Sequence, residues 1–231
     1  MISLTRRLAA ACFILLLLAS CGSTEKADAP DGSRDSAASE STTSTTASTS
    51  TTTIPAPPAY RVLSEEELTG SLLGLEDLPA GYSQDPPEAG DTEKTFCDYV
   101  PPFMPQIEVG RKFTKGGGMS SEALVIGFRQ FTSPDEARAA FDALTNALAS
   151  CTGETYKGRQ LTYAPMSAPK VGDASIGVKI SQNGADLLQF FALAGPTLIN
   201  TGGGGPLNAS TEELTSLLDA QIRAYQTAAQ G

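Results

Sequence analysis

Ser167 and Lys170 have the spacing that lets a lysine activate a serine one helical turn earlier. This Ser-x-x-Lys pattern occurs in penicillin-binding enzymes, and residues 181–183 (Ser-Gln-Asn) fit the Ser-x-Asn pattern that follows it there. The mechanism needs a helix that starts at the serine, and Pro165 and Pro169 disfavour one. No Lys-Thr-Gly follows. We therefore expect no serine chemistry in this segment.

Two glycine runs and two groups of acids are the other patterns that chemistry could use. The runs at 116–118 and 202–205 lack the Lys-Ser/Thr of a phosphate-binding loop, so we interpret both as flexible turns. Acids at 76–77 and 91–93 could serve acid–base or calcium chemistry, but no EF-hand-like loop surrounds them, and a solvated face explains them. The phenylalanines at 190–191 fit either a strand buried on both faces or the wall of a cleft.

The composition excludes several classes of function. The 231 residues include 16 Lys and Arg, 26 Asp and Glu and no His, for a net charge of −10. Without His there is no Ser-His or Cys-His nucleophile and no imidazole-bound zinc, and the acidity disfavours nucleic acid as a partner. We predict a non-enzyme with no catalytic residue, no cofactor and no metal site. A hydrolase that uses two carboxylates stays open, because sequence cannot show whether acids converge.

Residues 1–20 are typical of a secretory signal peptide, with two arginines followed by the apolar run Leu8–Leu18. The run is shorter than the about 20 apolar residues that span a bilayer. The sequence at 18–21 (Leu-Ala-Ser-Cys) matches the bacterial lipobox, which predicts cleavage before Cys21 and lipidation, including palmitate, at that residue. An ordinary signal peptide that happens to end at a cysteine is the alternative. Cys12 would leave with the signal.

Residues 21–59 are rich in Ser, Thr and Pro and hold almost no large aliphatic residue, which predicts a disordered tether before a domain at 60–231. Cleavage removes two arginines and no acid, so the mature chain stays strongly acidic and should not bind anionic headgroups through its surface. We expect the lipid on Cys21 to hold the chain at the outer face of the cytoplasmic membrane.

Three helices in the domain are predicted by one start signal, a serine at the N-cap and a glutamate three residues later. An apolar stripe at helical spacing follows the second and third of these signals. The pairs are Ser64 with Glu67, Ser133 with Glu136, and Ser210 with Glu213.

Alternating apolar residues predict strands at Ile107–Thr114, Ala123–Phe131, 175–181 and Asp186–Leu193, with Asn183-Gly184 as a hairpin turn between the last two. The expected order is α-β-β-α-β-β-β-β-α. This order predicts a single α+β domain, an antiparallel sheet with flanking helices.

Cys97 and Cys151 remain after processing, and an even pair in an exported chain is best interpreted as a disulfide. A redox-active or metal-binding pair is the alternative, which the 54-residue separation and the lack of a Cys-x-x-Cys motif disfavour.

The segments 75–82 (Leu-Glu-Asp-Leu-Pro-Ala-Gly-Tyr), 131–137 (Phe-Thr-Ser-Pro-Asp-Glu-Ala) and 172–173 (Gly-Asp), with Cys97 and Cys151, resemble an actinobacterial family of exported domains. That family includes PknH-like extracytoplasmic sensor domains and lipoproteins that carry the domain alone. The resemblance covers residues 60–229. It implies an antiparallel sheet with flanking helices, and a cleft for an unidentified ligand.

The chain departs from these relatives in three ways: it has one Cys pair instead of two, Tyr82 where relatives often have Trp, and no kinase. Beyond the disulfide no site residue can be transferred, so the sequence leaves the ligand-binding residues unknown. We predict a monomeric lipoprotein with a sensor-like domain that binds an envelope ligand or partner. The alternative is an adaptor or chaperone for an envelope enzyme or transporter.

Overall fold

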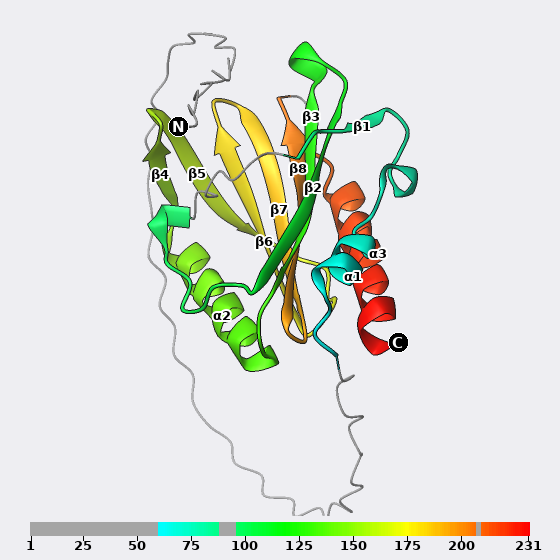
Figure 1. Cartoon of the computed structure of the whole chain (residues 1–231). Helices are drawn as coiled ribbons and strands as arrows, with labels where there is room; N and C mark the ends of the chain where they lie inside the picture. The colour runs from blue at the N-terminus through cyan, green and yellow to red at the C-terminus, as the bar shows by residue number, and fades with distance from the viewer. Residues whose placement is uncertain (1–59, 88–95, 207–208) are drawn as a thin grey trace, which may run out of the picture. The chain divides into compact units, whose positions relative to one another are not determined.

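Eight antiparallel strands form one sheet in the computed structural model, which describes residues 60–87, 96–206 and 209–231 (Figure 1). The strands are β1 (Tyr82–Gln84), β2 (Ile107–Lys115), β3 (Glu122–Gln130), β4 (Gly153–Tyr156), β5 (Arg159–Met166), β6 (Ala174–Gln182), β7 (Ala185–Ala194) and β8 (Thr197–Gly205).

The order of strands across the sheet is β1-β2-β3-β8-β7-β6-β5-β4. The sheet therefore consists of two runs of hairpins, and β8 joins them by pairing with β3 on one side and with β7 on the other. Thr201 marks the junction, opposite Ile126 of β3 and Phe190 of β7. The predicted α+β domain with an antiparallel sheet is confirmed.

Three α-helices and three short 3-10 turns connect or cover these strands in the described residues. The α-helices are α1 (Glu65–Gly70), α2 (Pro134–Ser150) and α3 (Thr211–Gln230), and the turns are η1 (Leu75–Asp77), η2 (Phe96–Asp98) and η3 (Gly118–Ser120). Because β7 alternates its side chains, Phe190 packs in the core under α3, and Phe191 in the core under α2 on the other face. The buried-strand interpretation of these two phenylalanines is confirmed.

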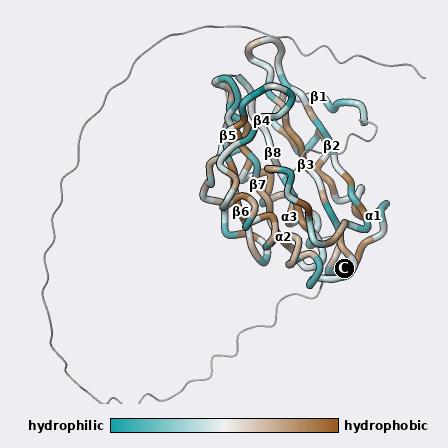
Figure 2. The backbone as a smooth tube through the Cα atoms, turned by 90° about the vertical axis from the view of Figure 1, so that its left-hand side faces the viewer, coloured by the Kyte–Doolittle hydropathy of each residue, from teal (hydrophilic) through white to brown (hydrophobic). Residues whose placement is uncertain are grey.

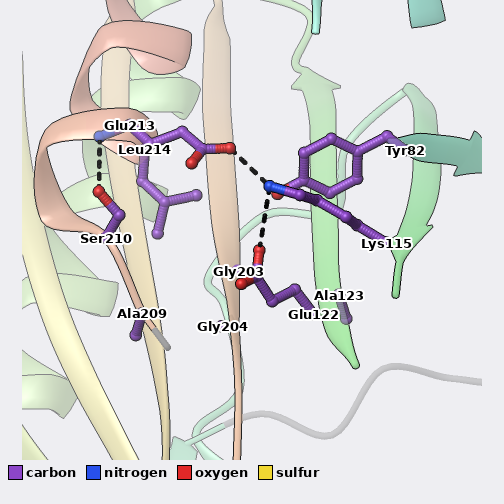
Figure 3. Close-up of a pocket in the computed structure, with 10 residues that line it drawn as sticks. All are labelled: Tyr82, Lys115, Glu122, Ala123, Gly203, Gly204, Ala209, Ser210, Glu213 and Leu214. Atoms are coloured by element: carbon purple, nitrogen blue, oxygen red, sulfur yellow. Dashed lines mark hydrogen bonds and ion pairs between the residues drawn. The ribbon is translucent and has the colours of Figure 1, made fainter. Parts of the chain in front are cut away.

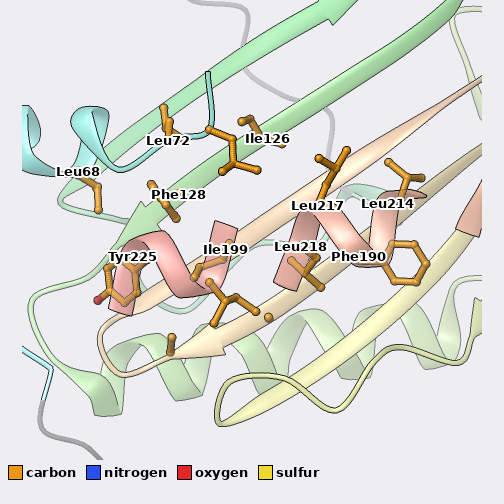
Figure 4. Close-up of a cluster of buried hydrophobic side chains, with 14 of the residues drawn as sticks. Leu68, Leu72, Ile126, Phe128, Phe190, Ile199, Leu214, Leu217, Leu218 and Tyr225 are labelled. Atoms are coloured by element: carbon orange, nitrogen blue, oxygen red, sulfur yellow. The ribbon is translucent and has the colours of Figure 1, made fainter. Parts of the chain in front are cut away.

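The larger core lies between the sheet, α1 and α3 (Figure 4). Tyr225 of α3 is fully buried there, with its ring centroid 5.6 Å from that of Phe128 and its hydroxyl 2.9 Å from the Thr197 hydroxyl. Figure 2 shows the hydrophobic stretches along the central strands and hydrophilic residues at several of the loops. We call the sheet face that α3 covers the α3 face.

The predicted serine caps are all present, but only one is a full capping box. Ser64 and Glu67 exchange both hydrogen bonds at the start of α1. Ser133 and Ser210 accept the amide hydrogens of the expected glutamates. The Glu136 carboxylate instead accepts bonds from Thr132, and the Glu213 carboxylate accepts one from a distant tyrosine, so these two boxes were predicted wrongly.

Two buried glutamines hold the segment that enters the domain. The Gln130 amide bonds both backbone groups of Leu63, at 2.9 and 2.7 Å. The Gln221 amide accepts from Leu73 N at 3.0 Å and donates to a carbonyl of the same segment. Tyr60 stacks on Tyr225, so the described chain starts beside the last turns of α3.

The structure has eight strands, two more than the predicted order, in which only four strands had been placed on residues. Two of the strands that had not been placed are short. β1 is three residues long and pairs only with the end of β2, while β4 is a four-residue strand at the opposite edge. Strands this short contain too few residues to establish an alternating pattern. Lys157 (φ +48°) and Gly158 (φ +74°) make the tight turn from β4 to β5.

The glycine run at 202–205 was wrongly predicted as a flexible turn, because it forms half of the central strand β8. A Cβ on Gly203 would lie 2.8 Å from the Ala123 carbonyl oxygen and 3.0 Å from a methyl group of Leu214. The missing side chains therefore let α3 approach the sheet closely. The other run, 116–118, does lie in a turn, between β2 and β3.

Candidate functional site

Three polar side chains stand in one row across β1, β2 and β3. The register places Tyr82 opposite Lys115 and Lys115 opposite Glu122. Phe113 and Leu124, each two residues away along its strand, are buried in the core under α3. Because side chains alternate between the faces of a strand, the polar row also lies on the α3 face. The polar row lies at the turn end of the β2–β3 hairpin, just beyond the last buried core residues of these two strands.

The first turn of α3 supplies a fourth polar group. Ser210 caps the helix by accepting the Glu213 amide hydrogen at 3.2 Å. The Glu213 carboxylate is thus free of the capping box and accepts a bond of 3.1 Å from the Tyr82 hydroxyl. The contact between Leu214 and Gly203 brings this turn down onto β8.

An open pocket of about 420 Å³ lies where the polar row meets the start of α3 (Figure 3). Its size falls within the range of small-molecule sites. The lining residues are Tyr82, Lys115, Glu122, Ala123, Gly203, Gly204, Ala209, Ser210, Glu213 and Leu214.

The charged groups of the pocket converge on Tyr82. The Lys115 ammonium is 3.7 Å from the Glu122 carboxylate and stands 5.2 Å from the centre of the Tyr82 ring. Partial burial, then the charge and hydrogen bond of Glu213, then the charge of Glu122 raise the pKa of the Tyr82 hydroxyl. Tyr82 is therefore a hydrogen-bond donor at neutral pH, beside two carboxylates and one ammonium.

This arrangement is suited to recognition. The two carboxylates, the hydroxyl and the ammonium each have further hydrogen-bonding capacity that a ligand could use. Small, partly enclosed pockets of this kind orient ligands through a few polar groups. Lys115 and Glu122 were not predicted as site residues, because the first predicted strand ended one residue before Lys115 and the second began one residue after Glu122. Glu213 was assigned to the helix cap alone.

The two cysteines of the domain form the predicted disulfide, with Cα atoms 5.9 Å apart. Cys151 ends α2 and is buried, whereas Cys97 is exposed in η2. Next to it, the ring of Phe96 packs edge-on against Tyr163 and Phe191. The disulfide thus fixes η2 over the α2 side of the sheet. Cys21, the predicted lipidation site, lies outside the described residues.

The other sequence patterns do not form sites in the described residues. Ser167 and Lys170 lie in an irregular segment after β5, without the helix that the serine mechanism requires. Asp77 bonds the Gly74 amide at 2.8 Å and so caps η1. The acids at 91–93 lie outside the described residues. Within the described ranges, no three His, Cys, Asp or Glu side chains are grouped to hold a metal, and no helix is long and apolar enough to cross a membrane.

The sequence matches no protein-family profile and no curated protein. The structure is similar to the crystal structure of the extracellular domain of PknH from Mycobacterium tuberculosis, with a TM-score of 0.60 and 15% sequence identity. The match covers 73% of this chain and 100% of that chain. The chain therefore shares its fold with that extracellular domain, as the resemblance in sequence predicted.

Proposed function

We propose that the domain binds a small ligand of the cell envelope in the pocket at the start of α3 and does not convert it. The observation that carries this proposal is the convergence of Lys115, Glu122 and Glu213 on Tyr82 beside a hollow of ligand size. Each of these groups already has a partner within the protein, which favours exchange with a ligand over acid–base work. The shared fold with an extracellular domain supports an extracytoplasmic location.

We further propose that the chain is a monomeric actinobacterial lipoprotein, held by acyl chains on Cys21 at the outer face of the cytoplasmic membrane. The position of the pocket suits this arrangement. The domain begins at Tyr60 beside the last turns of α3, whereas the pocket lies at its first turn. A helix of 20 residues is about 30 Å long, so the pocket is far from the point where the tether enters.

An adaptor role is the second candidate, and an exposed apolar loop favours it. Between η2 and β2 the chain exposes Val100 and Met104 by 83% and 76%, and Phe103 by 42%. A cluster of exposed apolar side chains often marks a protein-binding surface. The pocket remains the better supported site, because its charged groups are positioned by three strands and a helix.

Native mass spectrometry of the full chain, purified from its own host in mild detergent, tests the ligand-binding proposal. We expect the native mass to exceed the denatured mass of the same sample by the mass of one small compound. Because covalent lipid contributes to both masses, the difference reports only what is bound without a covalent bond. Equal native and denatured masses in repeated preparations would favour the adaptor role, and partner capture through residues 99–105 would be the next experiment.

A further inference from the structure

The pocket has more hydrogen-bond acceptors than donors. Glu122 and Glu213 together offer about eight lone-pair positions, and the side-chain donors that line the pocket are the Lys115 ammonium and the hydroxyls of Tyr82 and Ser210. These side chains carry two negative charges and one positive charge. A ligand that supplies N–H donors and positive charge would balance this set, whereas an anion would meet two carboxylates on a strongly acidic protein.

Lys115 shows where a positive charge is accommodated. Its ammonium stands over the Tyr82 ring at 5.2 Å and pairs with Glu122 at 3.7 Å. An aromatic face with a carboxylate beside it is a favourable environment for an ammonium group. The ion pair is long, and the Lys115 side chain is 34% exposed. The Glu122 side chain is 19% exposed. A long ion pair whose lysine stays in contact with solvent is weak, so the lysine can give up its place at modest cost.

We infer, resting on the proposed function of this pocket, that its ligand carries an ammonium group that displaces Lys115 from Glu122 and the Tyr82 ring. The Lys115 ammonium then competes with the ligand for the place beside Glu122 and the Tyr82 ring, and it occupies that place while the ligand is absent. Glu122 binds the incoming ammonium directly. Glu213 keeps the Tyr82 hydroxyl in place and contributes the second negative charge.

If the pocket binds an ammonium group, replacing Lys115 by a neutral residue should strengthen ligand binding. At an anion site, the same replacement should weaken ligand binding. The probes are 1,4-diaminobutane and succinate, two four-carbon compounds of opposite charge, titrated into the full chain by calorimetry at low salt. Lys115→Met should tighten diamine binding about fivefold, since it removes a competing charge. Glu122→Gln and Glu213→Gln should each weaken it at least about fivefold. Glu66→Gln, on the exposed side of α1, is the matched control and should change nothing.

Two results would overturn the inference that the ligand carries an ammonium group. One is succinate binding that Lys115→Met abolishes, which would make the pocket an anion site and leave the proposed function standing. The other is diamine binding that none of the three pocket variants alters, which would indicate attraction to the acidic chain in general. Lys115→Gln serves as a second neutral variant, and circular dichroism verifies that each variant folds.

Discussion

Replacing both Cys97 and Cys151 by alanine is expected to lower the free energy of unfolding by about 4 kcal/mol, because the disulfide closes a loop across 54 positions. The bond restricts the unfolded chain, and in the folded state it fixes η2 over the sheet. Without it, Phe96 also loses a constraint that keeps its ring against Tyr163 and Phe191. Urea unfolding measured by circular dichroism gives the change.

Reduction of the wild-type chain should reproduce the effect of the double substitution. Phe96→Ala with the disulfide intact is the control for lost packing, and its effect should be smaller, because this ring is only partly buried. An unfolding midpoint that neither reduction nor the double substitution lowers would show that the disulfide does not stabilise the domain.

Replacing Cys21 by alanine is expected to move the chain completely from the membrane fraction to the soluble fraction. Two or three acyl chains hold a protein firmly, since each buried methylene contributes about 0.8 kcal/mol. The acidic surface of the mature chain offers no electrostatic substitute at an anionic bilayer. Cell fractionation, together with metabolic labelling by palmitate, measures both consequences.

Cys12→Ala is the matched control for this experiment, because Cys12 lies in the same N-terminal segment but inside the apolar run. This variant should be labelled and retained like the wild type. Palmitate labelling that persists in Cys21→Ala would refute the lipobox and, with it, the proposed anchor.

Local signals made much of the fold predictable. The serines at 64, 133 and 210 start helices because a cap needs only its own turn. Asn183 and Gly184 form the hairpin turn with φ of +50° and +83°, since both residue types tolerate this conformation. These features depend on a few consecutive residues, so the sequence alone reveals them.

Features that depend on distant neighbours were not predictable in the same way. The glycines at 202–205 have no side chains to alternate, and β3 and β7 on either side make them a strand. Lys115 and Glu122 enter the sheet through their pairing with each other across the hairpin. The opposite charges of Lys115 and Glu122, on the two sides of the Gly116–Gly118 turn, were a usable signal for this pairing, because residues on either side of a hairpin turn face one another. The contact of Glu213 with Tyr82 spans 131 positions and had no signal in the sequence.

The most direct test of the pocket replaces one of two alanines by phenylalanine and repeats the native mass measurement on each variant. Ala209→Phe places a large ring in the pocket wall, whereas Ala164→Phe adds the same ring to an exposed position on β5, near the far edge of the sheet. If the pocket holds the ligand, Ala209→Phe loses the excess of native over denatured mass and Ala164→Phe keeps it. An excess that both variants retain would place the ligand elsewhere and contradict the proposed site.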